Sequence, residues 1–209
     1  MTVFDYSKGE IELFRKLDSP QKIQDYLNSI PFNFQVKKVT FMSPRLVLKN
    51  KKAHCVEGAM LASAILEFHG WKPLILDLRS TEKPYDYDHV VSVFKLNGCF
   101  GAISKTNHAV LRFREPVYKS VRELAMSYFH EYFLDNGRKT LREYSDLLDL
   151  NRFNKMNWRT TEKNLFPIPE YLDTVKHHSI LTKRQIKNLR NADKIEIEAG
   201  KIMEYSQWK

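Results

Sequence analysis

The sequence predicts an α+β fold in which a central buried helix packs against a small antiparallel sheet, followed by a helical C-terminal extension. Three observations support this prediction. The stretch 55–70 is apolar and slim, as a helix buried on all sides must be. Two strand-like runs follow it, and the dipeptide Asn97-Gly98 after them is a strong hairpin signal. Helical patterns then dominate from about residue 118.

The size of the chain predicts one domain. Its 209 residues, 43% of them hydrophobic, suffice for a single core over residues 1–209, with the core fold at about 30–115 and the mainly helical extension at about 118–209. No apolar run approaches the roughly 20 residues of a membrane span. The first residues are acidic where a secretory signal is basic and then apolar. We therefore expect a cytoplasmic protein with no membrane partner and with free thiols.

The N-terminal region is expected to contain two short helices within residues 10–30. Ser19 is a good N-cap, Pro20 suits a first helical turn, and Pro31 ends the apolar periodicity. Residues 34–48 are expected to be extended or irregular.

The central helix should begin at Cys55. No charged side chain occurs between Gly58 and Glu67, and several residues in this stretch are small. His69-Gly70 supplies the stop, with glycine as the C-terminal cap. Strands are then expected at 73–78, 89–94 and 99–103, with a further candidate at 109–113.

The remainder is expected to be mainly helical. Apolar residues recur at helical spacing in 121–129 and again in 141–148. Residues 151–180 predict irregular structure with aromatic side chains in the core. The alternation of apolar and charged residues in 194–205, broken by Ala199-Gly200, predicts a terminal hairpin.

The chemistry is expected where the central helix and the second strand begin. A cysteine in the first turn of a helix lies against the positive end of the helix dipole, where free N–H groups stabilise a thiolate. A neighbouring imidazole lowers the pKa of the thiol further and transfers protons. Cys55 opens the helix and His89 opens the strand, so the sequence predicts a cysteine–histidine site.

This order of elements resembles the transglutaminase-like superfamily of papain-like cysteine enzymes. The matching segments are His54-Cys55-Val56-Glu57-Gly58-Ala59-Met60-Leu61-Ala62, Asp88-His89-Val90 and Gly98-Cys99-Phe100-Gly101-Ala102-Ile103-Ser104-Lys105-Thr106, so the resemblance covers about residues 50–110. It implies a papain-like core, with Cys55 as the nucleophile and His89 as the general base and acid.

The third catalytic position departs from the superfamily's pattern. Phe100 and Thr106 match, but Ser104 stands where the superfamily usually has aspartate. A serine hydroxyl accepts a hydrogen bond from the far imidazole nitrogen, yet it carries no charge and stabilises imidazolium less than aspartate does. Asn107 is the alternative third member, since an amide oxygen also orients a histidine. On an extended strand Ser104 and Thr106 share one face, which favours Ser104.

The resemblance implies a cysteine-dependent acyl-transfer enzyme that acts on an amide or peptide bond through a thioester. Its substrate would be a peptide, a protein or a small amide, and it would act as a peptidase, deamidase or transamidase. It needs no metal and no cofactor. The alternative is a catalytically weak or inactive binding module of the same fold that uses its basic surface. The loss of the aspartate at Ser104 supports this second interpretation.

Other chemically able side chains have structural interpretations. Cys99 lies within a strand and is expected in the core, and His54 and His69 flank the buried helix and are expected to be structural. Glu57 is expected to complement the helix dipole. His177-His178 lacks partners at metal-ligand spacing and is expected in a solvated loop.

The formal charge of +9 raises the question of nucleic-acid binding. Basic residues alternate with acidic ones along most of the chain, which dilutes any field of a single sign. The exception is a C-terminal run with four basic residues, three of them on one face if the run is helical: Lys183, Arg184, Lys187 and Arg190. We nevertheless expect no nucleic-acid partner.

Overall fold

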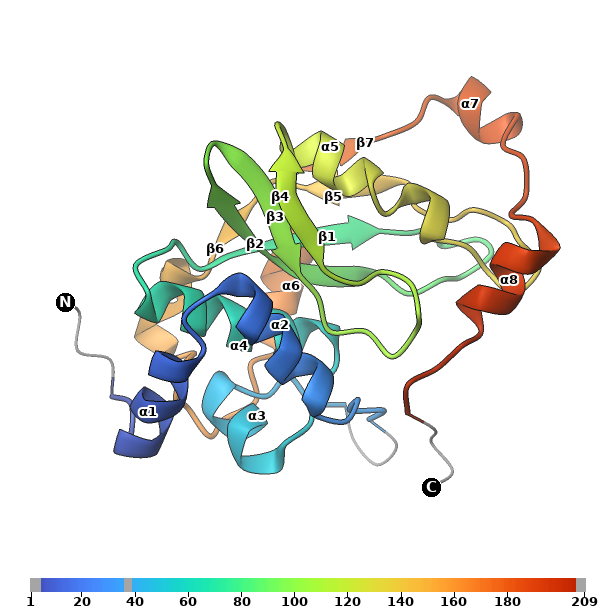
Figure 1. The fold of residues 1–209 in the computed structure, drawn as a ribbon. Coiled ribbons are helices and arrows are strands. Elements are labelled where there is room, and N and C mark those ends of the chain that lie inside the picture. Colours follow the sequence, from blue (N-terminus) through green and yellow to red (C-terminus); the bar gives the residue numbers. More distant parts are fainter. Residues whose placement is uncertain (1–4, 36–38, 206–209) are drawn as a thin grey trace.

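The computed structural model describes residues 5–35 and 39–205 as a mixed α and β structure (Figure 1). The helices of the first half are α1 (Lys8–Lys16), α2 (Pro20–Ser29), α3 (Pro44–Asn50) and α4 (Cys55–Phe68). The later helices are α5 (Val121–Met126), η1 (Phe129–Glu131), η2 (Leu150–Met156), α6 (Pro167–Thr174), α7 (Lys183–Lys187) and α8 (Lys194–Gly200). In the described part of the chain, no helix is both long and apolar enough to cross a bilayer.

An open antiparallel sheet runs through the middle of the molecule. Its strands are β1 (Leu74–Arg79), β2 (His89–Leu96), β3 (Cys99–Ile103), β4 (Arg114–Tyr118), β5 (Glu143–Ser145), β6 (Leu148–Asp149) and β7 (His177–Ser179). Their order is β4-β3-β2-β1-β5-β7, and β6 also pairs with β1. The α+β class is confirmed, but with seven strands in the described residues the sheet is larger than expected.

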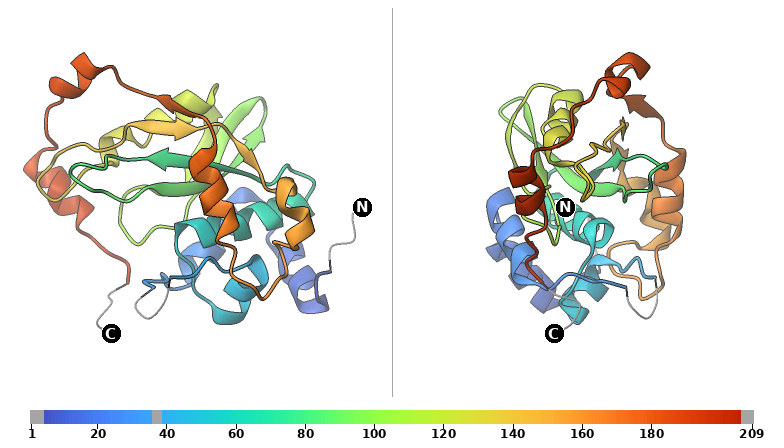
Figure 2. Two further views of the ribbon diagram at one scale, coloured as in Figure 1. Left: turned by 180° about the vertical axis from the view of Figure 1, so that it is seen from behind. Right: turned by 90° about the vertical axis from the view of Figure 1, so that its right-hand side faces the viewer.

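The two faces of the sheet are covered by different helices. Helices α1 to α4 gather below the sheet in Figure 1, and α6 lies behind it in that view, as Figure 2 shows from the back. Alternate strand residues point to opposite faces of the sheet. Ile75 and Val90 pack on the face covered by α4 and α6, whereas Leu76 and Val91 pack on the face covered by α5. Helix α4 is buried along most of its length, as predicted.

The first half of the chain follows its sequence signals. Ser19 caps α2, with its hydroxyl accepting from the Lys22 N–H, and α4 runs from Cys55 to Phe68 before Gly70 takes a φ of +90°. Strands β1, β2 and β3 lie where they were expected, and Leu96 pairs with Cys99 across the predicted hairpin turn. Within residues 34–48, α3 begins at Pro44 because Ser43 caps it, so the prediction of irregular structure was wrong there. The strand expected at 109–113 forms at Arg114–Tyr118 instead.

The prediction of a helical C-terminal extension was wrong in an important respect, because strands β5, β6 and β7 of this region belong to the sheet. Residues 141–148 do not form a helix. Leu78 pairs with Tyr144 and Ile75 with Leu148, and the two β1 partners lie on opposite faces of the sheet. Backbone pairing with an already formed strand outweighs a weak helical periodicity in so short a segment.

The predicted terminal hairpin at 194–205 was also wrong. Asp193 and Glu196 form a capping box, in which the Asp193 N–H donates to the Glu196 carboxylate over 2.6 Å, and α8 follows. The last described residues do pair in an extended form, but with a distant partner, since Met203 bridges to His108.

Candidate functional site

Cys55 is the first residue of α4. The first intrahelical bond runs from the Gly58 N–H to the His54 carbonyl over 2.8 Å, so His54 is the N-cap residue. The N–H groups of the first turn have no carbonyl partner within the helix and point toward the thiol end. The Cys55 side chain is half-buried at the border of the cluster formed by α4, α6 and the sheet. Cys55 therefore lies at the positive end of a buried helix.

His89 is the first residue of β2, and its ring is held from behind by Ser104. The distance from His89 Nε2 to Ser104 Oγ is 2.7 Å. The Ser104 hydroxyl donates its own proton to the Leu111 carbonyl over 2.5 Å. It therefore accepts from His89, which places a proton on Nε2. Nδ1 is left as the ring nitrogen that can accept a proton.

Two further contacts fix Ser104. Its N–H donates to Gln24 Oε1 over 2.9 Å, and its carbonyl accepts from Gln24 Nε2 over 2.8 Å. Leu111 adopts a φ of 61°, an uncommon conformation for leucine, and its N–H donates to Glu131. Gln24 of α2 and Leu111 together fix the position of the Ser104 hydroxyl next to His89.

The imidazoles of two histidines, His54 and His89, act on the pKa of the Cys55 thiol through hydrogen bonding and charge. Burial by itself would raise the pKa of the thiol. The two hydrogen bonds and the charges of the two histidines outweigh it and bring the pKa of Cys55 well below its ordinary value. The site thus favours a thiolate.

His54 was expected to be structural, but in the structure its imidazole also lowers the pKa of the Cys55 thiol. Its side chain is buried, and Nε2 lies 2.8 Å from the Thr40 carbonyl and 3.5 Å from Glu57 Oε1. Burial opposes protonation of the ring, but the hydrogen bond and charge of Cys55, with Glu57 and the Thr40 carbonyl, raise the pKa of His54. The sequence signal was its position at the N-cap directly before the cysteine, three residues before a glutamate.

Glu57 is fully buried and accepts four hydrogen bonds. Oε1 accepts from Thr40 Oγ1 at 2.8 Å and from the Met42 N–H at 2.9 Å. Oε2 accepts from Asn33 Nδ2 at 3.0 Å and from the His54 N–H at 3.1 Å. Glu57 therefore lies in the first helical turn, as predicted, and also ties the segment around Thr40 to the start of α4.

Asn107, the alternative third member, does not contact His89 in the structure. Its Nδ2 donates to the Tyr205 carbonyl and its Oδ1 accepts from the Tyr205 N–H, each over 2.9 Å. Because the chain turns after Ser104, Asn107 faces the C-terminal segment. Of the two candidates, Ser104 is the one that the structure brings to the imidazole.

Three other expectations are corrected or refined. Cys99 is half-buried rather than in the core, because it is the first residue of β3 beside the turn. His177 does not lie in a solvated loop: it is in β7, and its Nε2 lies 3.0 Å from the buried carboxylate of Asp77. His69 is structural, with Nε2 2.7 Å from the Phe14 carbonyl.

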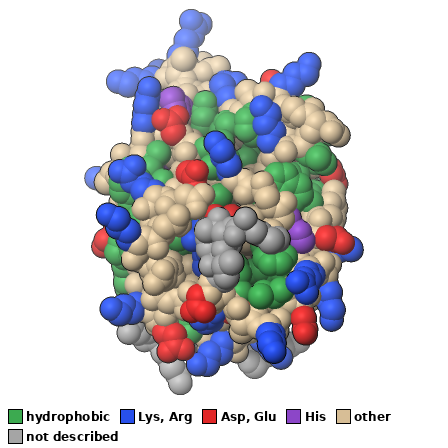
Figure 3. Space-filling model, turned by 90° about the vertical axis from the view of Figure 1, so that its left-hand side faces the viewer, with side chains coloured by type: hydrophobic (Ala, Val, Ile, Leu, Met, Phe, Trp, Pro, Cys, Tyr) green, Lys and Arg blue, Asp and Glu red, His purple; other side chains and the backbone are tan. Residues whose placement is uncertain are grey.

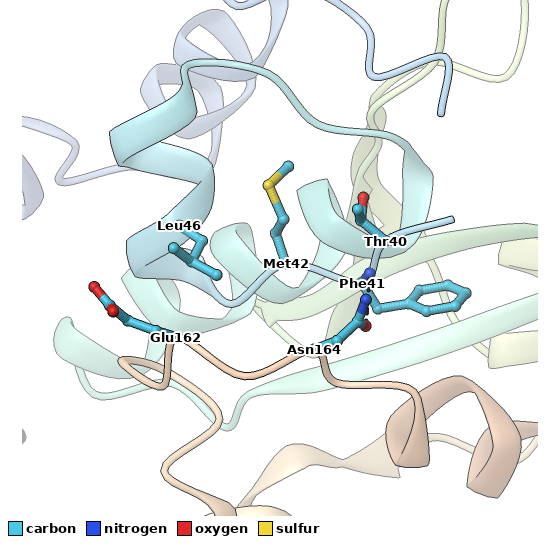
Figure 4. Close-up of a pocket in the computed structure, with 6 residues that line it drawn as sticks. All are labelled: Thr40, Phe41, Met42, Leu46, Glu162 and Asn164. Carbon is cyan, nitrogen blue, oxygen red and sulfur yellow. Dashed lines mark hydrogen bonds between the residues drawn. The ribbon is translucent and has the colours of Figure 1, made fainter. Parts of the chain in front are cut away.

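A cavity of about 210 Å³ lies beside the segment that contacts His54 (Figure 4). Thr40, Phe41, Met42, Leu46, Glu162 and Asn164 line it. Thr40 lines this cavity and also accepts from His54 through its carbonyl.

The basic residues show no single gathering on the face drawn in Figure 3, where Lys and Arg side chains are dispersed among acidic and uncharged ones. In the C-terminal run, α7 spans only Lys183–Lys187, and Arg190 lies beyond it, paired with Asp193 at 2.5 Å. The four basic residues therefore do not share one helical face.

No family model matches the sequence, and no curated protein sequence is significantly similar to it.

Proposed function

We propose that the protein is a cysteine-dependent acyl-transfer enzyme that cleaves an amide or peptide bond through a thioester. The observation that supports this most is the half-buried thiol at the start of α4, whose pKa two imidazoles lower, one of them oriented by a 2.7 Å contact with Ser104. A low thiol pKa, an oriented base and free helix N–H groups are the parts that nucleophilic catalysis by cysteine needs.

The reaction divides into two steps. The Cys55 sulfur attacks the carbonyl carbon, the C–S bond forms, and the carbonyl electron pair moves to oxygen near the first N–H groups of α4. The tetrahedral adduct collapses, the C–N bond breaks, and the leaving amine takes a proton from the His89 imidazolium. Water, or an amine, then attacks the thioester while His89 accepts its proton. Finally the C–S bond breaks and the thiolate is restored.

Ser104 in place of a carboxylate sets the character of this site. The hydroxyl orients His89 by accepting from Nε2–H, but it adds no negative charge to stabilise imidazolium. Papain-like enzymes with an amide in this position work by the same principle of orientation. The alternative is a binding module without turnover, in which Cys55 forms no acyl adduct even if its thiol is ionised.

The test measures the rate of Cys55 alkylation by iodoacetamide as a function of pH. The experiment uses a Cys99→Ser background, since Cys99 is half-buried and would otherwise contribute to the signal. We expect a midpoint well below the roughly 8.5 of free cysteine. Cys55→Ser in the same background is the blank.

A second measurement separates an enzyme from a reactive binding module. The protein is mixed with p-nitrophenyl acetate, and an acyl adduct on Cys55 is sought by mass spectrometry, along with a burst of p-nitrophenol. We expect both in the Cys99→Ser protein and neither in Cys55→Ser or His89→Ala. Alkylation with the midpoint of free cysteine and no adduct would favour the binding module.

A further inference from the structure

His54 is the feature of the site that the proposed mechanism does not use. It is buried, it directly precedes the nucleophile, and its ring is fixed on three sides. A carbonyl oxygen only accepts, so the 2.8 Å contact with Thr40 places a proton on Nε2. The Phe41 ring packs edge-on against the imidazole, with centroids 5.4 Å apart. Nδ1 is therefore the ring atom that faces the first turn of α4, where the Cys55 thiol and the Glu57 N–H lie.

Glu57 indicates the charge state of this ring. Each of its two oxygens accepts two hydrogen bonds, as an ionised carboxylate does, and the side chain is fully buried. A buried carboxylate is normally paired with a positive group. Among residues 5–35 and 39–205, the basic side chain within ion-pairing distance of Glu57 is His54, at 3.5 Å. Electrostatics at the start of α4 therefore favour an imidazolium at His54.

We propose that His54 is the fixed positive partner that holds Cys55 as a thiolate, which leaves His89 free to carry protons. This inference rests on the proposed function and extends it to the control of that site by pH. The cluster then contains two imidazoliums, at His54 and His89, against the Cys55 thiolate and the Glu57 carboxylate, and its net charge is zero. Ser104 gives His89 no carboxylate partner, whereas His54 has one in Glu57.

The division of labour follows from where each ring is held. In His89, Nε2 is held by Ser104, and Nδ1 exchanges protons with Cys55 and with the leaving group. The Nε2–H of His54 is committed to Thr40 and the charge of His54 to Glu57, so it does not return a proton during turnover. Charged and titratable groups around this cluster are Glu57 on α4, His89 on β2 and Tyr132 after η1, whose pKa is raised by burial and, to a smaller extent, by the charge of Cys55.

The test compares two variants in the Cys99→Ser background by pH-dependent alkylation and by acyl-adduct formation. His54→Gln keeps an amide donor for the Thr40 carbonyl but carries no charge. We expect its alkylation midpoint to rise by about one pH unit or more, which lowers the alkylation rate about tenfold at pH values below both midpoints. His89→Ala should retain most of the low midpoint but form no acyl adduct. An unchanged midpoint in His54→Gln, with a low midpoint in the parent, overturns the role of His54 and leaves the proposed function standing.

A reciprocal measurement covers the case in which His54→Gln does not fold. In the Cys55→Ala protein, imidazole resonances are followed by NMR through a pH titration. Linkage requires that removal of the thiolate lowers the midpoint of His54 by as much as His54 lowers that of Cys55. A His54 midpoint that is the same with and without the thiol overturns the proposal. A parent protein whose thiol titrates like free cysteine overturns both this inference and the proposed function.

Discussion

Individual residues at the start of α4 carry charge that is buried but matched. Glu57 satisfies four donors, His54 lies 3.5 Å from Glu57 and directly precedes Cys55, and Ser104 orients His89. Hydrogen bonds to charged groups are worth more than neutral ones, and a buried donor that loses its acceptor bears the full desolvation cost. Single substitutions here should therefore affect stability and reactivity in separable ways.

Glu57→Gln should destabilise the protein by about 1–3 kcal/mol, because the amide nitrogen cannot accept from the donors that face it. It should also raise the midpoint of Cys55 alkylation, since His54 loses its negative partner. Urea unfolding and alkylation kinetics measure the two effects. The control is Glu12→Gln on the exposed side of α1, expected to stay within about 0.5 kcal/mol. Equal stability of the two variants would contradict this view of Glu57.

Ser104→Ala removes the acceptor behind His89 and leaves the Nε2–H of a buried ring unpaired. If the loss of the Ser104 hydroxyl raises the activation free energy of acylation by about 1.4 kcal/mol, acylation by p-nitrophenyl acetate should slow about tenfold. Ser92→Ala is the matched control, because Ser92 is also buried in the sheet but its hydroxyl forms a 2.8 Å hydrogen bond with Ser63 and not with the imidazole. Acylation that slows equally in both variants would point to a general loss of stability.

Two elements must approach closely for the site to form. Helix α4 and the chain after β3 meet at Gly58, where an added Cβ would lie 2.4 Å from the Lys105 Cβ. Lys105 is held in turn, because its Nζ donates to the Leu27 and Ile30 carbonyls at the end of α2. Burial lowers the pKa of Lys105 to about 8. The absent side chain at Gly58 thus sets the distance between the Cys55 helix and the Ser104 segment.

Gly58→Ala should therefore destabilise the protein by about 1–3 kcal/mol despite the better helix propensity of alanine. It should also displace Ser104 and slow acylation. Gly9→Ala is a control with the same chemical change in α1, where a Cβ meets nothing within 4 Å. That variant should be neutral or stabilised by up to about 1 kcal/mol. Thermal unfolding of both proteins and the acylation assay give the comparison, and a stable, fully reactive Gly58→Ala protein would refute the argument.

At the scale of the whole molecule, the C-terminal half completes the sheet and returns to the site region. Strands β5 and β6 pair with β1, β7 extends the edge, and Tyr205 binds Asn107 near the Ser104 segment. His177 of β7 pairs with Asp77 of β1, and both side chains are buried. Burial raises the pKa of Asp77, which His177 only partly offsets, and the hydrogen bond and charge of Asp77 outweigh burial to raise the pKa of His177.

This pair predicts a pH dependence of stability. A histidine whose pKa is raised on folding stabilises fully below its unfolded value of about 6.5 and loses that contribution as pH rises through its folded pKa. His177→Gln should therefore cost about 1–3 kcal/mol near pH 6 and less near pH 9. Urea unfolding at both pH values measures the difference, with His178→Gln, whose partner Asp146 is exposed, as the control. A cost that does not fall with pH would mean that the charge of His177 is unimportant.

The sequence by itself determined the elements whose signals are local. Ser19-Pro20 starts α2, Asn97-Gly98 makes the hairpin, and the apolar run from Cys55 makes α4, because capping, turn geometry and side-chain volume act within a few residues. The sequence also nominated His89 and Ser104, which a 2.7 Å contact joins in the structure.

Only the tertiary structure decided where each remaining segment found its partner. Residues 141–148 become strands because β1 offers them an unpaired edge, and Asn107 turns from the imidazole because Tyr205 accepts and donates there. The role of His54 is equally non-local, since the Thr40 carbonyl that orients its ring lies 14 residues away. Hydrogen bonds between distant segments and the burial of charge depend on three-dimensional proximity, which periodicity along a sequence does not encode.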